Sequence, residues 1–261
     1  MPPAVEGPVL DVDLGPPGRA FRRRVLVALA VAGALAAALC VWLLPDAGPG
    51  APSASGAGSS GSSGPSWVVL ARPSGYHGEA GYPVGFPRTT LGAVSAAAAA
   101  LEASWTLDSG RAEQAAELYA PAERRATARD DAGAAVRGWR ETLGLPPDGD
   151  LPTGAALRTE PIGVRWNDGA GSSTGDSAGE EVLVSLLVRV NATRGTDESG
   201  PAYSAPLAVN MLMIWRPGVR GGSGDWVRAL DPPPAAVPRI AEPGTREFAA
   251  AGWKAVTGSP P

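Results

Sequence analysis

Few residues of this chain are suited to chemistry. Among 261 residues there is one histidine, His77, and one cysteine, Cys40. A histidine-based catalytic group would have to act from a Gly-rich stretch, and a lone cysteine allows neither an intrachain disulfide nor a cysteine-rich metal site. The chain contains no phosphate-binding loop, no dinucleotide fingerprint and no ligand spacing typical of a transition metal. We therefore predict no catalytic, cofactor-binding or metal-binding residue.

Two further groups match a catalytic pattern only formally. Residues 171–175 read Gly-Ser-Ser-Thr-Gly, but a nucleophile elbow needs a strand before it and a helix after it, and this match lies inside a Gly/Ser-rich loop. Asp130 and Asp131 lie beside three arginines between 124 and 129. They form either an acid/base pair or a solvated helix face with ion pairs at helical spacing. We interpret them as a solvated face.

The overall charge excludes a broad nucleic-acid-binding surface. The net charge is −4, with 22 basic and 26 acidic residues. Hydrophobic residues make up 44%, enough for a core, while 35 Gly and 27 Pro indicate much loop. We interpret the eight tryptophans as core and interface anchors. Three of them on neighbouring predicted strands, Trp166, Trp215 and Trp226, are also placed to line a cavity.

The N-terminal quarter of the sequence predicts a membrane anchor. Residues 25–44 are twenty residues without a charge, and such a helix spans about 30 Å, the thickness of a bilayer core. Four arginines at 19–24 precede it, and the next basic residue is Arg72. This asymmetry predicts a cytoplasmic tail (1–24), a transmembrane helix (25–44), a flexible Gly/Ser/Pro linker (45–66) and an extracytoplasmic domain (67–257).

The alternative to an anchor is a cleaved signal peptide. The apolar region of such a peptide is usually about 7–15 residues long, which is shorter than this run, and no small-x-small site follows it. We therefore favour an uncleaved anchor in the cell membrane, with the N-terminus in the cytoplasm and the C-terminus outside.

Helical spacing dominates residues 89–144, after an extended strap at 67–88. Thr89 or Thr90 is a candidate cap. A second helix is predicted over 111–119, and a third begins at Pro121 and ends before Gly144. The first helix carries one apolar stripe at steps of three and four: Leu91, Val94, Ala98, Leu101 and Trp105.

Residues 155–231 change to a period of two. Long strands are predicted over 182–190 and 207–215, with shorter ones over 161–166 and 225–230. A short helix over 243–256, carrying Phe248 and Trp253, follows them. Helices first and strands after predict an α+β domain, in which about three helices pack on one face of a four-stranded antiparallel sheet.

This order of parts resembles a known family. A basic tail, one membrane helix, a tether, three helices and a four-stranded sheet resemble the bitopic assembly-factor subunit of type IV secretion and conjugation machines. The resemblance implies a cystatin-like (nuclear-transport-factor-2-like) extracytoplasmic domain. Residues 81–94, Gly-Tyr-Pro-Val-Gly-Phe-Pro-Arg-Thr-Thr-Leu-Gly-Ala-Val, also look like the helix entry of uncharacterised actinobacterial membrane proteins in conjugation-like gene sets. The family implies no catalytic residue for this chain.

Two functions follow from this interpretation. The first is a non-enzymatic scaffold whose partners are the membrane and other envelope proteins, with self-association left open and no direct nucleic-acid binding. The second is a ligand-binding or enzymatic domain that uses a cavity between helices and sheet. Its candidate residues are Tyr119, Trp139, Trp166, Trp215, Asp130 and Asp131.

Overall fold

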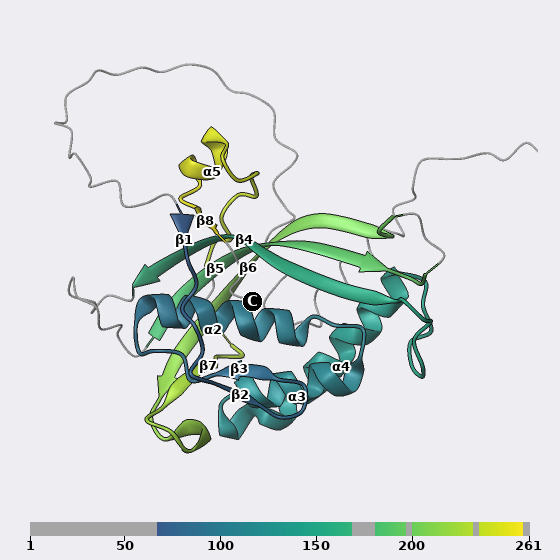
Figure 1. Ribbon diagram of the computed structural model, residues 1–261, viewed down its shortest axis with the longest axis horizontal. Coiled ribbons are helices and arrows are strands. Elements are labelled where there is room, and N and C mark those ends of the chain that lie inside the picture. The colour runs from purple at the N-terminus through teal and green to yellow at the C-terminus, as the bar shows by residue number, and fades with distance from the viewer. Residues whose placement is uncertain (1–66, 169–180, 197–199, 232–234, 258–261) are drawn as a thin grey trace, which may run out of the picture.

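The computed structural model describes residues 67–168, 181–196, 200–231 and 235–257 (Figure 1). The predicted tail (1–24), membrane helix (25–44) and linker (45–66) lie outside these ranges, as does the Gly-Ser-Ser-Thr-Gly stretch. Among the described residues, no helix combines the length and apolar character needed to span a bilayer.

A six-stranded mixed sheet forms the centre of the domain, in the order β1-β8-β4-β5-β6-β7. Strands β4 to β7 form an antiparallel meander, β8 adds antiparallel to β4, and β1 pairs with β8 in parallel. The strands are β1 (Trp67–Val68), β4 (Ala156–Asp168), β5 (Glu181–Thr193), β6 (Tyr203–Arg216), β7 (Asp225–Arg228) and β8 (Lys254–Val256).

The prediction of a four-stranded antiparallel sheet, and with it the cystatin-like arrangement, is therefore wrong. The two additional strands come from opposite ends of the described chain, and they are two and three residues long. Strands this short show no recognisable alternation, so the period-two pattern that indicates the long strands is absent from them.

Four α-helices accompany the sheet in the described ranges. They are α2 (Thr90–Ser104), α3 (Ser109–Tyr119), α4 (Arg125–Thr142) and α5 (Arg246–Ala250), with 3-10 turns η1 (Ala122–Arg124) and η2 (Val219–Gly221). Of the two candidate caps, Thr89 and Thr90, it is Thr89 that caps α2, since its hydroxyl accepts from the Gly92 N–H at 3.0 Å. Helix α3 begins before the predicted residue 111, because Asp108 caps it in the same way.

The predicted C-terminal helix over 243–256 is wrong in extent. Helix α5 covers five residues, and the chain then turns through Gly252 at φ +78° into strand β8. A residue in this left-handed region cannot continue a right-handed helix, so the turn at Gly252 ends α5.

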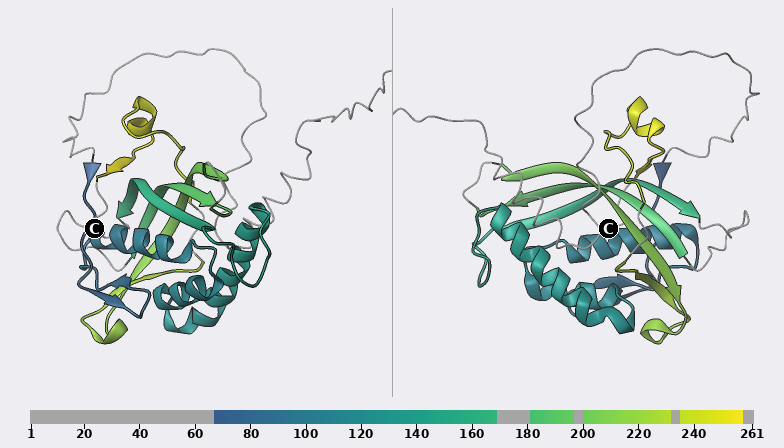
Figure 2. Two further views of the ribbon diagram at one scale, coloured as in Figure 1. Left: turned by 45° about the vertical axis from the view of Figure 1, so that its right-hand side comes forward. Right: turned by 180° about the vertical axis from the view of Figure 1, so that it is seen from behind.

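Helix α2 lies between the sheet and a layer formed by α3 and the β2–β3 hairpin (Figures 1 and 2). All residues from Gly92 to Leu101 are buried, so α2 has no solvent-facing side along this stretch, contrary to the predicted single apolar stripe. Its run of alanines allows neighbouring elements to approach closely on every side. The space between helices and sheet is therefore filled by α2 itself.

The opposite face of the sheet is covered by the C-terminal segment. Phe248 and Trp253 pack there against Ile162 and Leu187. A Cβ at Gly163 would lie 2.9 Å from the Phe248 ring, so the missing side chain makes room for α5. Part of the sheet thus lies between α2 and residues 235–253, before the chain enters the sheet itself as β8.

The predicted strap at 67–88 contains a hairpin. Strands β2 (Gly75–His77) and β3 (Tyr82–Val84) pair antiparallel, with Gly75 opposite Val84. The connecting loop contains Gly78 and Gly81, both with φ +69°, a conformation that glycine adopts without strain. This hairpin lies beside α3 (Figure 1) and forms one wall of a cleft.

Candidate functional site

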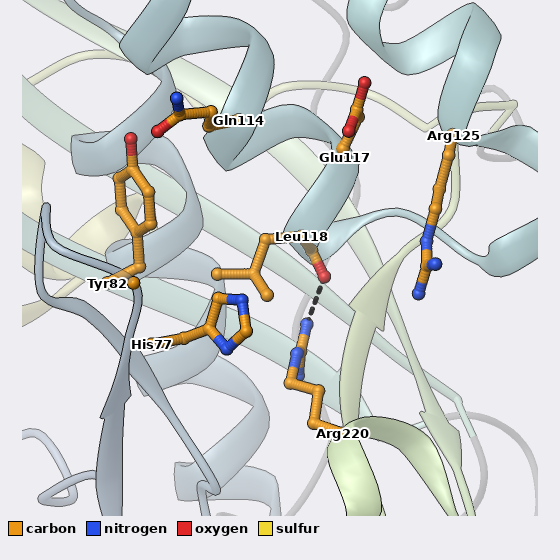
Figure 3. Close-up of a pocket in the computed structure, with 8 residues that line it drawn as sticks. His77, Tyr82, Gln114, Glu117, Leu118, Arg125 and Arg220 are labelled. Carbon is orange, nitrogen blue, oxygen red and sulfur yellow. Dashed lines mark hydrogen bonds between the residues drawn. The ribbon is translucent and has the colours of Figure 1, made fainter.

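The candidate site is a cleft between the β2–β3 hairpin, α3, the first residue of α4 and turn η2 (Figure 3). Its volume is about 540 Å³, and it is lined by His77, Gly78, Tyr82, Gln114, Glu117, Leu118, Arg125 and Arg220. A second hollow of about 330 Å³ shares Arg125 and Arg220 with it and extends toward the turn between β6 and β7. The two spaces are therefore neighbours.

The residues lining the cleft come from segments far apart in the chain. Figure 3 shows His77 and Tyr82 of the hairpin on one side and Arg125 of α4 on the other, with Leu118 between them. Arg220 projects from turn η2 toward the backbone of Leu118. The cleft therefore has an apolar centre and polar sides.

Arg220 is the most constrained of these residues. Its side chain is 10% exposed, its Nη1 pairs with the carboxylate of Asp225, and its Nη2 donates to the Leu118 carbonyl oxygen at 2.5 Å. Its backbone has φ +60°, a left-handed conformation that is unfavourable for a residue with a Cβ. The buried ion pair and the carbonyl contact hold this conformation in place.

Asp225 joins the hairpin to the sheet. Its side chain is 3% exposed, and its two oxygens accept from the backbone N–H groups of Gly85 (2.7 Å), Phe86 (3.2 Å) and Trp226 (2.8 Å) in addition to Arg220. A buried carboxylate needs this number of donors to offset its lost hydration. Its lone pairs are thus engaged in holding the structure together.

Two tyrosines tie the same region together. The Tyr119 hydroxyl donates to the Pro83 carbonyl at 2.7 Å, and the Tyr82 hydroxyl donates to the Arg111 carbonyl at 2.9 Å. Burial raises the pKa of both phenols, and for Tyr119 the nearby guanidinium of Arg220, 5.5 Å from the ring centroid, opposes that rise. Both hydroxyls therefore stay protonated at neutral pH and act as hydrogen-bond donors.

The charged side chains at the rim of the cleft are more exposed than the buried groups described above. Glu117 lines the cleft and shares Arg129, which does not line it, with Glu113: the Arg129 guanidinium lies 3.2 Å from the Glu117 carboxylate and 3.0 Å from that of Glu113. Arg125 and Arg216 are exposed, and their guanidinium groups have no hydrogen-bond or ion-pair partner within the described ranges. These two cations are accessible at the surface of the hollows.

Most of the residues proposed for a cavity between helices and sheet lie elsewhere. Tyr119 is buried next to Arg220 at the edge of the cleft. Neither of the two hollows is lined by the other candidates, which are Trp139, Trp166, Trp215, Asp130 and Asp131.

The tryptophans instead make packing contacts. Trp215 meets Trp226 edge to face at 5.4 Å, and Trp139 meets Tyr203 in the same way at 5.6 Å. Trp166 lies under the Lys254 ammonium at 4.3 Å. The three tryptophans proposed to line one cavity, 166, 215 and 226, therefore do not share one.

Sequence reasoning did not identify Arg220 and Asp225. Asp225 is the first residue of a predicted strand and precedes a tryptophan. A charged residue next to a buried strand needs a partner, and this is the one local signal that the sequence offers. Its partners at 85 and 86 lie about 140 positions earlier, at a separation that no periodic pattern covers.

Metal-binding side chains do not converge in the described part of the chain, where no group of three His, Cys, Asp or Glu residues is close enough to hold an ion. No protein family, curated protein or solved structure matches the chain. The likeness to conjugation-associated membrane proteins therefore stays a prediction from the sequence.

Proposed function

We propose that this chain is a non-enzymatic, membrane-anchored binding protein that docks other envelope proteins. It would act as a scaffold or assembly subunit of an envelope complex of the conjugation or type IV secretion kind. The observation that supports this proposal is that the polar groups around the cleft fall into two sets, one buried and one accessible. The buried polar groups hold the hairpin in place, while the charged side chains at the rim and the apolar Leu118 at the centre face the open cleft.

Catalysis requires groups free to exchange protons or electron pairs, whereas the buried polar groups beside the cleft are engaged in hydrogen bonds that hold the structure together. Asp225 is occupied by four donors, and both tyrosines donate to backbone carbonyls. His77 has no hydrogen-bonding partner in the described ranges that would orient its ring. A rigid wall with an accessible mixed surface suits docking better than acid–base chemistry.

The proposed anchor gives this surface a defined reach. The predicted linker at 45–66 is a Gly/Ser/Pro-rich sequence of 22 residues, and strand β1 begins after it at Trp67. A flexible chain of this length spans on average about 25 Å. The domain would therefore sample partners within a layer of about that depth outside the membrane.

Membrane co-purification tests the proposed function. A C-terminally tagged full chain is purified from mildly solubilised membranes of the host, with an unrelated single-pass protein as the control. We expect envelope proteins that are absent from the control. Recovery of the chain alone would contradict the scaffold role.

A protease test addresses the proposed orientation. Protease added to intact protoplasts should digest the domain at 67–257 together with a control ectodomain. Protection of the domain while the control is cut would show that the orientation is wrong.

A second candidate function is the binding of a small molecule in the cleft itself. Its volume of about 540 Å³ favours this, because small-molecule sites usually occupy about 300–1,000 Å³. A ligand at one hundred times its Kd would stabilise the folded chain by about 2.7 kcal/mol. Unchanged melting of the full chain across a broad metabolite set would count against this function.

A further inference from the structure

Strand β6 has an open edge along its first half. On one side it pairs with β5 over residues 203–214, whereas on the other side β7 pairs only with residues 213–216 (Figure 1). At Asn210 the side-chain amide donates to the Ala235 carbonyl at 3.0 Å, so the C-terminal segment reaches the strand there. The backbone of residues 203–209 has no partner on this side within the described ranges, and we call it the β6 edge.

The unpaired backbone groups of the β6 edge point away from the sheet. In an antiparallel strand the N–H and C=O of one residue point to the same side, and successive residues alternate between the two sides. The Leu212 carbonyl accepts from the Ala229 N–H and so points toward the β7 side. Ser204, Pro206 and Ala208 share this direction, because the register with β5 is unbroken. They offer three carbonyl oxygens but only two N–H groups, since proline has none.

The β6 edge carries no charge. Its sequence is Tyr-Ser-Ala-Pro-Leu-Ala-Val, and proteins usually protect a free strand edge with charged residues, with proline or with a covering element. Pro206 is the one such device among these residues. Tyr203 and Leu207 are half-buried against the main core, and Ala208 packs on the other face of the sheet. An extended polypeptide without charges opposite these positions matches this edge, because its backbone supplies donors and acceptors at strand spacing.

A second copy of the chain has this chemistry. Two identical strands pair antiparallel about a twofold axis, so that each copy presents the same edge to the other. The absence of charges means that this pairing opposes no like charges, and it places apolar side chains beside apolar side chains. The start of the edge is also held in position, because the Tyr203 ring meets Trp139 edge to face at 5.6 Å.

The part of the chain that precedes the described ranges favours a second copy over other strands. The predicted anchor (25–44) and linker (45–66) would keep all copies in one membrane and within about 25 Å of it. One strand pair is smaller than the interfaces of about 1,200 Å² or more that hold stable complexes in solution. Confinement in one layer raises the effective concentration of the second copy, so that a weak pairing becomes sufficient.

We propose that two copies of the membrane-anchored chain pair antiparallel along the β6 edge and so join their sheets into one. This inference goes beyond the docking of other envelope proteins. It shares with the proposed function only the membrane anchor.

Site-specific crosslinking in the host tests the pairing on the full membrane-bound chain. A photoreactive amino acid replaces Ser204, which is exposed and lies on the β6 edge. We expect an adduct of twice the mass of the chain, and mass spectrometry should map the crosslink to residues 203–209 of the second copy.

Two substitutions should change the adduct in opposite directions. A208P removes one of the two outward N–H groups, and we expect at least an approximately tenfold loss of adduct. P206A restores the missing N–H in both copies, and we expect about fivefold more adduct at limiting expression. A gain of adduct has no explanation in misfolding, so P206A keeps the test decisive if melting shows that A208P unfolds the domain.

V69P is the matched control. Val69 is 52% exposed on the other outer strand of the sheet, and its N–H points away from β8, because the preceding Val68 carbonyl accepts from Thr257. The control therefore also removes an outward N–H that the described sheet does not use, and its adduct should equal that of the parent chain.

Each other outcome overturns the proposal. An adduct with another protein, an adduct with a different surface of the second copy, or no adduct would refute pairing along the β6 edge. Equal losses from A208P and V69P, or no gain from P206A, would refute it as well. If envelope proteins still co-purify in these cases, the scaffold role stands. A self-adduct as expected, without any co-purified envelope protein, would remove the scaffold role and leave the pairing.

Discussion

Replacing Asp225 by asparagine tests whether one carboxylate holds the β2–β3 hairpin against the rest of the domain. The substitution keeps the size of the side chain but removes its charge and turns one acceptor into a donor. The N–H groups of Gly85, Phe86 and Trp226 then compete for one oxygen, and Arg220 becomes an unpaired charge. The two side chains are 3% and 10% exposed, so water cannot replace the lost contacts.

The expected loss of stability follows from these contacts. Breaking a buried ion pair by removing one partner costs about 3–5 kcal/mol, because the other charge stays buried. We therefore expect D225N to lower the free energy of unfolding by about that amount. R220Q should lower the free energy of unfolding by about 2 kcal/mol less in the D225N background than in the parent chain, because the two residues contact each other and their effects are not additive.

Urea unfolding of the full chain in detergent micelles measures this loss through tryptophan fluorescence, since Trp226 is fully buried next to the substituted residue. Amide hydrogen exchange should accelerate at Gly85 and Phe86. The exposed Asp148 supplies a control, and D148N should change stability by less than about 0.5 kcal/mol. A loss below about 1 kcal/mol with unchanged exchange would show that other contacts hold the hairpin.

Two further substitutions test the packing and the electrostatics of α2. Alanine usually stabilises a helix over glycine, but a Cβ at Gly92 would lie 1.9 Å from the Pro87 carbonyl oxygen, so G92A should cost about 1–3 kcal/mol in urea unfolding. G110A, whose Cβ meets nothing closer than 3.4 Å, should not destabilise, and equal effects of the two would contradict this account. Glu102 is exposed at the surface, but desolvation by the neighbouring atoms and the charge of Glu160 raise the pKa of its carboxyl to about 7 from its ordinary 4.5. Ionisation therefore weakens the fold as pH rises between these values, and E102Q should raise Tm at pH 8 but leave it unchanged at pH 4. The same Tm shift at both pH values would refute the assignment.

The long elements of this domain were readable from sequence because their signals are local. Alternation over 182–190 indicated β5, and the alternating residues 182, 184, 186, 188 and 190 do lie in the main core. Thr89 indicated the start of α2 because the hydrogen bond it makes spans three residues. The sequence thus indicated the positions of β5, β6 and α2, whereas β4 (Ala156–Asp168) is about twice as long as the strand predicted over 161–166.

Tertiary contacts determined that the short strands form and that α2 is buried on all sides. Strand β1 forms because Trp67 and Val68 meet Ala255 and Val256 from the other end of the domain. The alanines of α2 are compatible with either a solvent-facing or a buried helix. The helix is buried because the sheet packs on one side of it and α3 and β3 pack on the other. Neither outcome follows from periodicity, because β1 is too short to show a period and a run of alanines has no contrast between its faces.

The chemistry of the surface was decided in the same way. The sequence by itself determined that the chain has few residues suited to catalysis, since composition fixes how many histidines and cysteines are present. Only the tertiary structure decided that Arg220 is buried against Asp225 while Arg125 beside it stays exposed. Two arginines have different roles here because burial and partners depend on residues more than one hundred positions away. Gly85 donates to Asp225, and Leu118 accepts from Arg220.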